Sequence, residues 1–188
     1  ERQLARLEAF QQQVGAMAKD VLMRRGTLSF YHYRPISDEI YRVPILIVSP
    51  PSNRGYIFDL AEGQSLVEFL LKRGYDVFVV DWNPPRSEEH VLKMDDYVMD
   101  FIPDCVARVR EITGEPDLTL MGYCMGGTLA VMYTALEGAD NVKNLVCFTT
   151  PIDFEHMTLF RNWSDPRHFE VDRLVDSIGN IPGEMIMG

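Results

Sequence analysis

The residues best suited to chemistry lie in the run Gly122-Tyr123-Cys124-Met125-Gly126-Gly127. A thiol at the tip of a sharp turn between a strand and a helix is placed for covalent catalysis. Such a turn is so tight that the residues two before and two after the nucleophile must be very small. Gly122 and Gly126 meet this demand. The motif therefore predicts a nucleophile elbow with Cys124 at its tip.

The position of Cys124 also favours reaction at its sulfur. The helix expected after the motif begins beside Cys124, and the partial positive charge at its N-terminus favours a thiolate. The backbone N–H of Met125 would point to the place where an oxyanion forms during attack on a carbonyl. A buried structural cysteine in a glycine-rich turn is the alternative. The apolar run Leu118–Met121 before the motif and the helical pattern after it argue against that alternative.

A second candidate feature is the loop Pro50–Arg54, which follows the apolar run Pro44–Ser49. In folds with a nucleophile elbow, the loop after this strand supplies the second oxyanion donor. Asn53 offers both a backbone and a side-chain donor there, and Arg54 is a candidate contact for a phosphate. An ordinary turn built on proline and asparagine is the alternative interpretation of the loop.

Two acidic residues also stand at predicted strand ends, where ligand sites collect in open α/β sheets. Asp81, followed by Trp82, ends one apolar run, and Asp153 follows another. An acid in such a place more often caps or orders a loop, and we expect that role for both.

The other two cysteines are predicted to pack in the core, because Cys105 lies on an apolar helical stripe and Cys147 within an apolar strand. Three sparse cysteines argue against a disulfide framework and favour a reducing cytoplasm. No group of cysteines and histidines has zinc-site spacing, so no metal is expected. A net charge of −10 argues against nucleic-acid binding through bulk electrostatics. No apolar run is long enough to span a bilayer.

Short apolar runs rich in β-branched residues indicate strands that are buried on both faces. These runs are residues 44–49, 76–81, 118–121 and 142–149. Helical patterns at 64–73, 95–112 and 128–136 alternate with them, and Pro103 should kink or split the second helix. The alternation predicts an α/β fold of the α/β-hydrolase type, with a mostly parallel sheet flanked by helices.

The ends of the chain depart from this alternation. Residues 1–26 are predicted to form a helical arm, with apolar side chains at helical spacing over 3–24, which packs on its own domain or binds a partner. Residues 27–151 form the predicted core, which starts with two antiparallel segments at 28–33 and 39–43. From Ile152 the rhythm is lost, and 152–188 is expected to begin a cap insertion, with the last strands of the fold missing.

Five stretches of the chain resemble poly(3-hydroxyalkanoate) synthase catalytic subunits. They are PPSNRGYIFDL, DVFVVDWNPP, GYCMGGTLA, TTPIDF and GNIPGEM. The resemblance runs from Leu28 to Gly188. The short N-terminal arm and the pair Asn53-Arg54 resemble the two-component synthases more than the long single-subunit ones.

The resemblance implies a cytoplasmic acyltransferase that polymerises (R)-3-hydroxyacyl-CoA into a polyester and releases coenzyme A. It assigns the nucleophile to Cys124 and implies no cofactor beyond the CoA thioester that serves as substrate. The implied partners are the growing polyester chain and its granule surface, a second synthase subunit and a second copy of the chain. A cysteine esterase or lactone hydrolase of the same fold, and a non-catalytic domain that binds a granule or a partner, remain as alternatives.

The family's catalytic aspartate and histidine lie well beyond the elbow, and this sequence stops before them. None of His32, His90, His156 and His168 matches the family's histidine. The elbow's general base and its orienting acid are therefore not assigned within these 188 residues.

We predict that the 188-residue chain alone releases no CoA from a 3-hydroxyacyl-CoA, because a neutral thiol without a base is a poor nucleophile. Only Asp153 with His156 or His168 follows the order nucleophile, acid, histidine that this fold uses. The measurement is CoA release by the purified chain and by its His156→Ala variant. Robust turnover that disappears in the variant would contradict the prediction.

Overall fold

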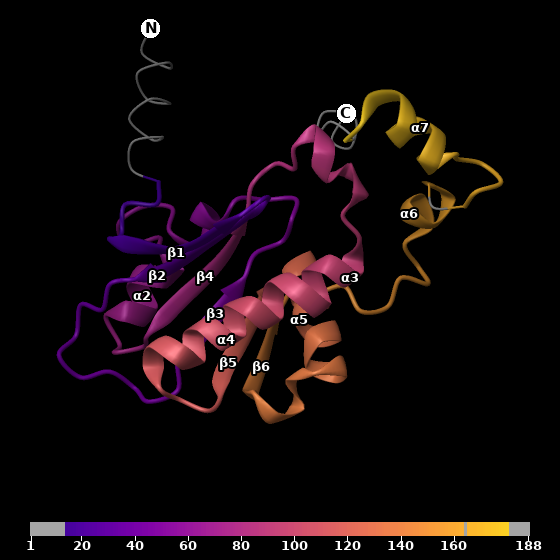
Figure 1. Ribbon diagram of the computed structural model, residues 1–188. Helices are drawn as coiled ribbons and strands as arrows, with labels where there is room; N and C mark the ends of the chain where they lie inside the picture. The colour runs from indigo at the N-terminus through magenta and orange to yellow at the C-terminus, as the bar shows by residue number, and fades with distance from the viewer. Residues whose placement is uncertain (1–13, 164, 181–188) are drawn as a thin grey trace, which may run out of the picture.

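The computed structural model describes residues 14–163 and 165–180, which contain a mixed sheet with the strand order β1-β2-β4-β3-β5-β6 (Figure 1). β3, β4 and β5 are parallel to one another, and β6 is parallel to β5. β1 and β2 are antiparallel to each other, and β2 is antiparallel to β4. The strands are β1 Lys19–Arg25, β2 Leu28–Tyr33, β3 Ile45–Val48, β4 Val77–Trp82, β5 Leu118–Tyr123 and β6 Val142–Phe148.

The central strands are buried on both faces, as their continuous apolar runs predict. Every residue of β3 and β4 is buried. Alternate side chains of β3 enter different cores: Leu46 packs on one face of the sheet and Ile47 on the other. The parallel centre and the flanking helices confirm the predicted fold class.

Helices cover each face of the sheet. α4 (Ile102–Thr113) and α5 (Met125–Leu136) contribute to the core on one face, and the turn η1 (Gly55–Phe58) with α2 (Leu66–Leu71) covers the other. Ser65 caps the start of α2, and its hydroxyl accepts a hydrogen bond from the Glu68 N–H at 3.0 Å. Both layers are needed because strands buried on two faces require apolar partners on each side.

The predicted helix over residues 95–112 is divided just before Pro103. α3 (Met94–Asp96) is followed by a π-helical turn, η3 (Tyr97–Phe101), and only then by α4. Proline has no N–H to donate, so the carbonyl four residues earlier, on Met99, loses its usual helical partner. Within η3 the N–H of Ile102 instead donates to the Tyr97 carbonyl, and this shift to a wider turn accommodates the proline.

The N-terminal prediction is wrong where the structure describes it. Residues 1–13 lie outside the described part, but Lys19–Arg25 is strand β1, which is paired with β2, and not the end of a helix. Arg25 pairs with Leu28 across the two-residue turn Gly26-Thr27, where Gly26 has φ +55°. A glycine at the first position of a two-residue turn is a hairpin signal. The apolar residues before Gly26 also fit a helical spacing, and this pattern led to the wrong prediction of a helix.

The second N-terminal segment is also different from the prediction. Residues 39–43, expected to pair with 28–33, form no strand, and β1 takes that place beside β2 instead.

The prediction that 142–149 is buried on both faces is also wrong for the described residues. β6 lies at the edge of the sheet and is half-buried or exposed along its length. Leu145 and Phe148 are 38% and 43% exposed, and Cys147 is exposed, which contradicts the core position expected for it. An edge strand lacks the second neighbour that would cover it.

The last described segment leaves the sheet and forms two short helices, α6 (Thr158–Trp163) and α7 (Val171–Ile178), which lie apart from the sheet in Figure 1. The chain leaves β6 at its carboxyl end. At Asn180 the side chain donates to the carbonyls of Pro85 and Arg86, both at 2.9 Å, in the loop after β4. Residues 152–180 therefore depart from, and return to, the edge of the sheet where the parallel strands end.

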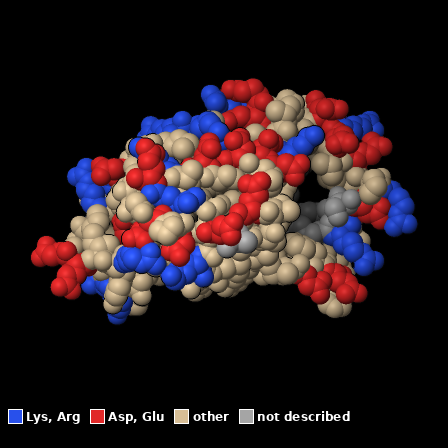
Figure 2. All heavy atoms as spheres, turned by 60° about the horizontal axis from the view of Figure 1, so that its bottom comes forward, with Lys and Arg blue, Asp and Glu red and all other residues tan. Residues whose placement is uncertain are grey.

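Surface charge and helix length are two further features of the described part of the chain. Acidic and basic side chains are intermixed over the face seen in Figure 2, in keeping with 28 acidic and 18 basic residues in the sequence. None of the described helices has the length and apolar character needed to cross a lipid bilayer.

We predict that Leu46→Ala lowers the free energy of unfolding by about 2–5 kcal/mol, because it opens a cavity in the central strand of the sheet. Leu46 is completely buried, whereas Leu136, at the end of α5, is 62% exposed. Leu136→Ala is the matched control and should change the free energy by less than about 0.5 kcal/mol. Urea unfolding of both variants measures the difference, and equal losses would contradict the assigned core.

Candidate active site

Cys124 is the single residue between β5 and α5, and its backbone is strained. Its φ and ψ are 51° and −127°, a region that residues other than glycine rarely adopt. Strained backbone of this kind costs about 1–3 kcal/mol and clusters at functional sites. The strand, the sharp turn and the helix predicted around Cys124 are all present.

The small residues around Cys124 are required by direct backbone contacts. A Cβ on Gly122 would lie 2.3 Å from the Gly127 Cα, and a Cβ on Gly126 would lie 2.2 Å from the Val48 carbonyl oxygen. Both separations are far below van der Waals contact, and the opposing atoms belong to the backbone. The two glycines therefore allow β5, α5 and β3 to meet at the turn, as the motif predicts.

The start of α5 is also held from the side of β6, by contacts that the sequence did not single out. The N–H of Cys124 donates to the Phe148 carbonyl at 2.9 Å, and the Thr128 hydroxyl donates to the Pro151 carbonyl at 2.8 Å. Thr149, between these acceptors, has φ +45° and is the other described non-glycine residue with positive φ. Cys124 and Thr149 directly follow the neighbouring parallel strands β5 and β6, so both strained residues lie at the same edge of the sheet.

The loop predicted to supply an oxyanion donor lies at the same edge of the sheet as the elbow. β3 and β5 are parallel, with Val48 opposite Gly122, and the loop begins directly after β3. The backbone N–H of Asn53 donates to the Pro50 carbonyl at 3.1 Å, which leaves its exposed side-chain amide as the donor that it can offer. Met125 is the first residue of α5, so its N–H has no acceptor within the helix.

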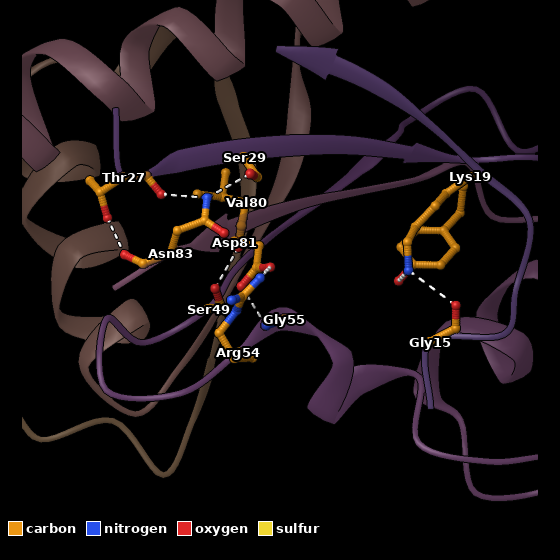
Figure 3. A network of polar contacts seen from close by, with 11 residues as sticks. Gly15, Lys19, Thr27, Ser29, Ser49, Arg54, Gly55, Val80, Asp81 and Asn83 are labelled. Atoms are coloured by element: carbon orange, nitrogen blue, oxygen red, sulfur yellow. Dashed lines mark hydrogen bonds and ion pairs between the residues drawn. The ribbon is translucent and has the colours of Figure 1, made fainter. Parts of the chain in front are cut away.

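Arg54 does not extend freely toward solvent as a phosphate contact would. Its Nη2 donates to Asp81 Oδ2 at 3.1 Å, and the Gly55 N–H donates to Asp81 Oδ1 at 2.6 Å (Figure 3). The Asp81 side chain is only 6% exposed. Asp81 thus orders a loop, as expected for an acid at a strand end, and it does so through a buried carboxylate.

The described histidines and Asp153 do not assemble a triad at Cys124. His32 pairs with Asp76 at 2.6 Å, but Asp76 precedes β4 and so lies at the opposite end of the parallel strands from the elbow. Asp153 is exposed and accepts from the Glu155 N–H at 2.8 Å, a local turn contact. His156 is exposed as well. No described side chain makes a hydrogen bond with the Cys124 sulfur.

The three cysteines differ in their surroundings. Cys105 is completely buried in α4, and burial raises the pKa of its thiol, as expected for a core residue. Cys147 is exposed on an edge strand, away from any helix start. Cys124 combines partial exposure with a place at the N-terminus of a helix. Among the described residues no group of acids, histidines and cysteines is arranged to hold a metal ion.

Comparison with known families agrees with this geometry. A model of the alpha/beta hydrolase fold matches residues 56–179. The chain belongs to the α/β-hydrolase fold family. A second model, of the N-terminus of poly-beta-hydroxybutyrate polymerase (PhaC), matches residues 5–70.

Curated relatives carry the resemblance further. The poly(3-hydroxyalkanoate) polymerase subunit PhaC of Haloferax mediterranei is 37% identical to this α/β-hydrolase chain, over 92% of the chain and 35% of the relative. The subunit of the same name from Allochromatium vinosum is 38% identical, over 92% of the chain and 48% of the relative. The predicted resemblance to this synthase family is confirmed. The chain spans less than half the length of either relative.

Solved structures show the same fold. A soluble variant of monoglyceride lipase from Saccharomyces cerevisiae superposes with a TM-score of 0.56, over 81% of this chain and 50% of the lipase. The two sequences are only 16% identical, so the likeness is one of architecture.

We predict that Cys124→Gly is more stable than Cys124→Ala by about 1 kcal/mol, because glycine adopts a positive φ without strain. Thr134, in the last turn of α5, is the matched control. There the order should reverse, with Thr134→Gly less stable than Thr134→Ala by about 1 kcal/mol. Urea unfolding measures all four variants, and the same order at both positions would contradict a strained elbow.

Proposed function

We propose that the polypeptide that carries this chain is an acyltransferase that polymerises (R)-3-hydroxyacyl groups from their CoA thioesters. The observation that carries the proposal is a cysteine at the strained tip of a nucleophile elbow, in a chain whose relatives are named poly(3-hydroxyalkanoate) polymerase subunits. In this proposal Cys124 forms a covalent acyl-enzyme, and CoA enters only as part of the substrate. No further cofactor takes part.

The proposed acylation step exchanges one thioester for another. The Cys124 thiolate attacks the substrate carbonyl carbon, and the developing oxyanion is stabilised by the Met125 N–H and the Asn53 side-chain amide. The tetrahedral intermediate then breaks its bond to the CoA sulfur, which leaves as a thiolate and takes up a proton. Because the bond formed and the bond broken are both thioesters, the step is close to neutral in energy.

Chain growth requires a second attack, by an alcohol. The hydroxyl of a 3-hydroxyacyl group loses its proton to a general base and attacks an acyl–cysteine thioester, which forms an ester and releases the sulfur. The described residues place no base at the Cys124 sulfur. The family resemblance assigns the base and its orienting acid to positions after those of this sequence, so we propose that other residues of the same polypeptide supply them.

Polymerisation also requires that water stays away from the acyl–cysteine, since hydrolysis would convert the enzyme into an esterase. We propose that residues 152–180 begin a cap over the elbow. The path of this segment supports the proposal, because it starts at the end of β6 and returns to the loop after β4. We further propose the cytoplasm and the surface of polyester granules as the place of action, with a second subunit and a second copy as partners.

We predict that Cys124→Ala abolishes CoA release from (R)-3-hydroxybutyryl-CoA by the polypeptide that carries this chain, because no other described cysteine stands at a helix start. Cys105→Ala and Cys147→Ala are the matched controls and should keep at least about half of the activity. A thiol assay of released CoA measures all three.

The products distinguish the remaining functions. Full activity in Cys124→Ala would contradict the proposal. Free 3-hydroxybutyrate in place of polyester would indicate a hydrolase of the same fold.

A further inference from the structure

We propose that Asp81 and Trp82, the last two residues of β4, are positioning residues that hold both ends of the loop 49–55 in place beside Cys124. Neither side chain is assigned to contact the substrate. The inference rests on the proposed function, since the position of this loop matters for chemistry only if Cys124 attacks a carbonyl.

Trp82 helps to hold the first end of the loop, where the N–H and the hydroxyl of Ser49 also donate to the Val80 carbonyl, at 3.2 and 2.5 Å. Its indole Nε1–H donates to the Ser49 carbonyl at 2.8 Å, within a site where the indole is only 2% exposed. The ring packs against Tyr97 and Phe101 at centroid distances of 4.9 and 5.9 Å. Both of these rings come from η3, the π-helical turn before Pro103. This turn therefore packs against the indole that donates to the Ser49 carbonyl.

Asp81 holds the second end. Consecutive strand residues point to opposite faces, so Asp81 faces away from Trp82. Its two carboxylate oxygens take one donor each from adjacent loop residues, Oδ1 from the Gly55 N–H at 2.6 Å and Oδ2 from Arg54 Nη2 at 3.1 Å. Gly55 is packed directly on it, since an added Cβ there would lie 3.0 Å from the Asp81 Cβ.

The end of β4 is itself held to β2 by the next residue, Asn83. Its backbone N–H donates to the Thr27 carbonyl at 2.7 Å, and its side-chain amide donates to the Ser29 hydroxyl at 2.7 Å. Figure 3 shows Asn83 between β2 and the loop, beside Asp81. Asp81 and Trp82 therefore bind the two ends of the loop, whereas Asn83 binds β2 and holds the end of β4 in place.

The elbow packs against the same loop at the Ser49 carbonyl, the group to which the Trp82 indole donates. An added Cβ on Gly126 would lie 2.7 Å from the Ser49 carbonyl oxygen, the acceptor of the indole N–H. α5 is thus packed against the first end of the loop, and its N-terminal residue Met125 is one proposed oxyanion donor. Asn53, the other, lies between the two held ends. In this proposal, Trp82 and Asp81 help to fix the position of Asn53 relative to Met125.

The test compares two reactions of Cys124 in the polypeptide that carries this chain. Acylation by p-nitrophenyl acetate passes through an oxyanion, whereas alkylation by iodoacetamide does not. Both reactions need the Cys124 thiolate, so the ratio of the acylation rate to the alkylation rate does not depend on the fraction of thiolate. The ratio therefore reports on the oxyanion site alone. Mass spectrometry of the peptide that contains Cys124 measures both rates, free of the contribution of Cys147.

Asp81→Asn is expected to lower the acylation-to-alkylation ratio by about 10- to 100-fold, given that losing one oxyanion donor costs about 10²–10³ in rate. The asparagine amide would place a donor against the donor Arg54 Nη2 and would release that end of the loop. Trp82→Phe keeps an aromatic ring but removes the N–H, and it should lower the ratio in the same direction.

Asp76→Asn is the matched control. Asp76 is a partly buried carboxylate with a side chain that is 14% exposed, and it stands at the other end of β4, paired with His32. The same substitution there should leave the ratio within about twofold of the parent protein. A ratio unchanged in both folded variants, Asp81→Asn and Trp82→Phe, would overturn the proposal.

The design separates this inference from the proposed function. Parent protein that is acylated at Cys124 by p-nitrophenyl acetate but never releases CoA from any 3-hydroxyacyl-CoA would contradict the proposed function alone. The effect of Asp81→Asn on the ratio would still decide the positioning role. If Asp81→Asn does not fold, Trp82→Phe alone decides it.

Discussion

The structure around Cys124 depends on one steric constraint: backbone atoms from β3, β5 and α5 come so close at the elbow that no side chain fits between them. Hypothetical Cβ atoms on Gly122 and Gly126 would stand 2.3 and 2.2 Å from backbone atoms of other elements. The close approach forces the chain to reverse within one residue, and Cys124 takes the strained φ of 51°. As a result, the Cys124 thiol lies at the N-terminus of α5, at the edge of the sheet where the parallel strands end.

The same constraint links the elbow to its surroundings. Because Gly126 of α5 packs directly on the backbone at the end of β3, the loop that follows β3 begins beside the elbow. That loop is then ordered from β4, through a buried carboxylate and a buried indole. The other flank is ordered from β6, where the Phe148 carbonyl accepts the Cys124 N–H. β4 and β6 therefore each form hydrogen bonds with one segment beside the elbow.

Much of this arrangement could be predicted from the sequence, because its signals are local. The glycines at 122 and 126 indicate the turn by size alone, and the apolar runs of β3 and β4 indicate strands buried on both faces. The loop that contains Asn53 and Arg54 lies at the same edge of the sheet as the elbow, as expected for a loop that follows a strand parallel to β5. The strand-end acid Asp81 was expected to order a loop, but nothing in the sequence shows which loop.

Other features depend on contacts that no local pattern records. The sequence of β1 is predicted to be the end of a helix, because its apolar residues also fit a spacing of three and four residues. Only its pairing with β2 shows that it is a strand. Cys147 lies in an apolar run like those of the central strands, yet its strand is at the edge of the described sheet. The strain at Thr149 and the π-helical turn that supports Trp82 are likewise products of packing.

The central claim is that Cys124 carries the acyl group, and a trapped intermediate tests it most directly. The polypeptide that carries this chain would be mixed briefly with (R)-3-hydroxybutyryl-CoA, quenched in acid, digested and examined by mass spectrometry. The account predicts 3-hydroxybutyryl groups on the peptide that contains Cys124, removable by hydroxylamine as expected for a thioester, and none on those that contain Cys105 or Cys147. CoA release with an unmodified Cys124 peptide, or acyl groups on another residue that persist in Cys124→Ala, would contradict it.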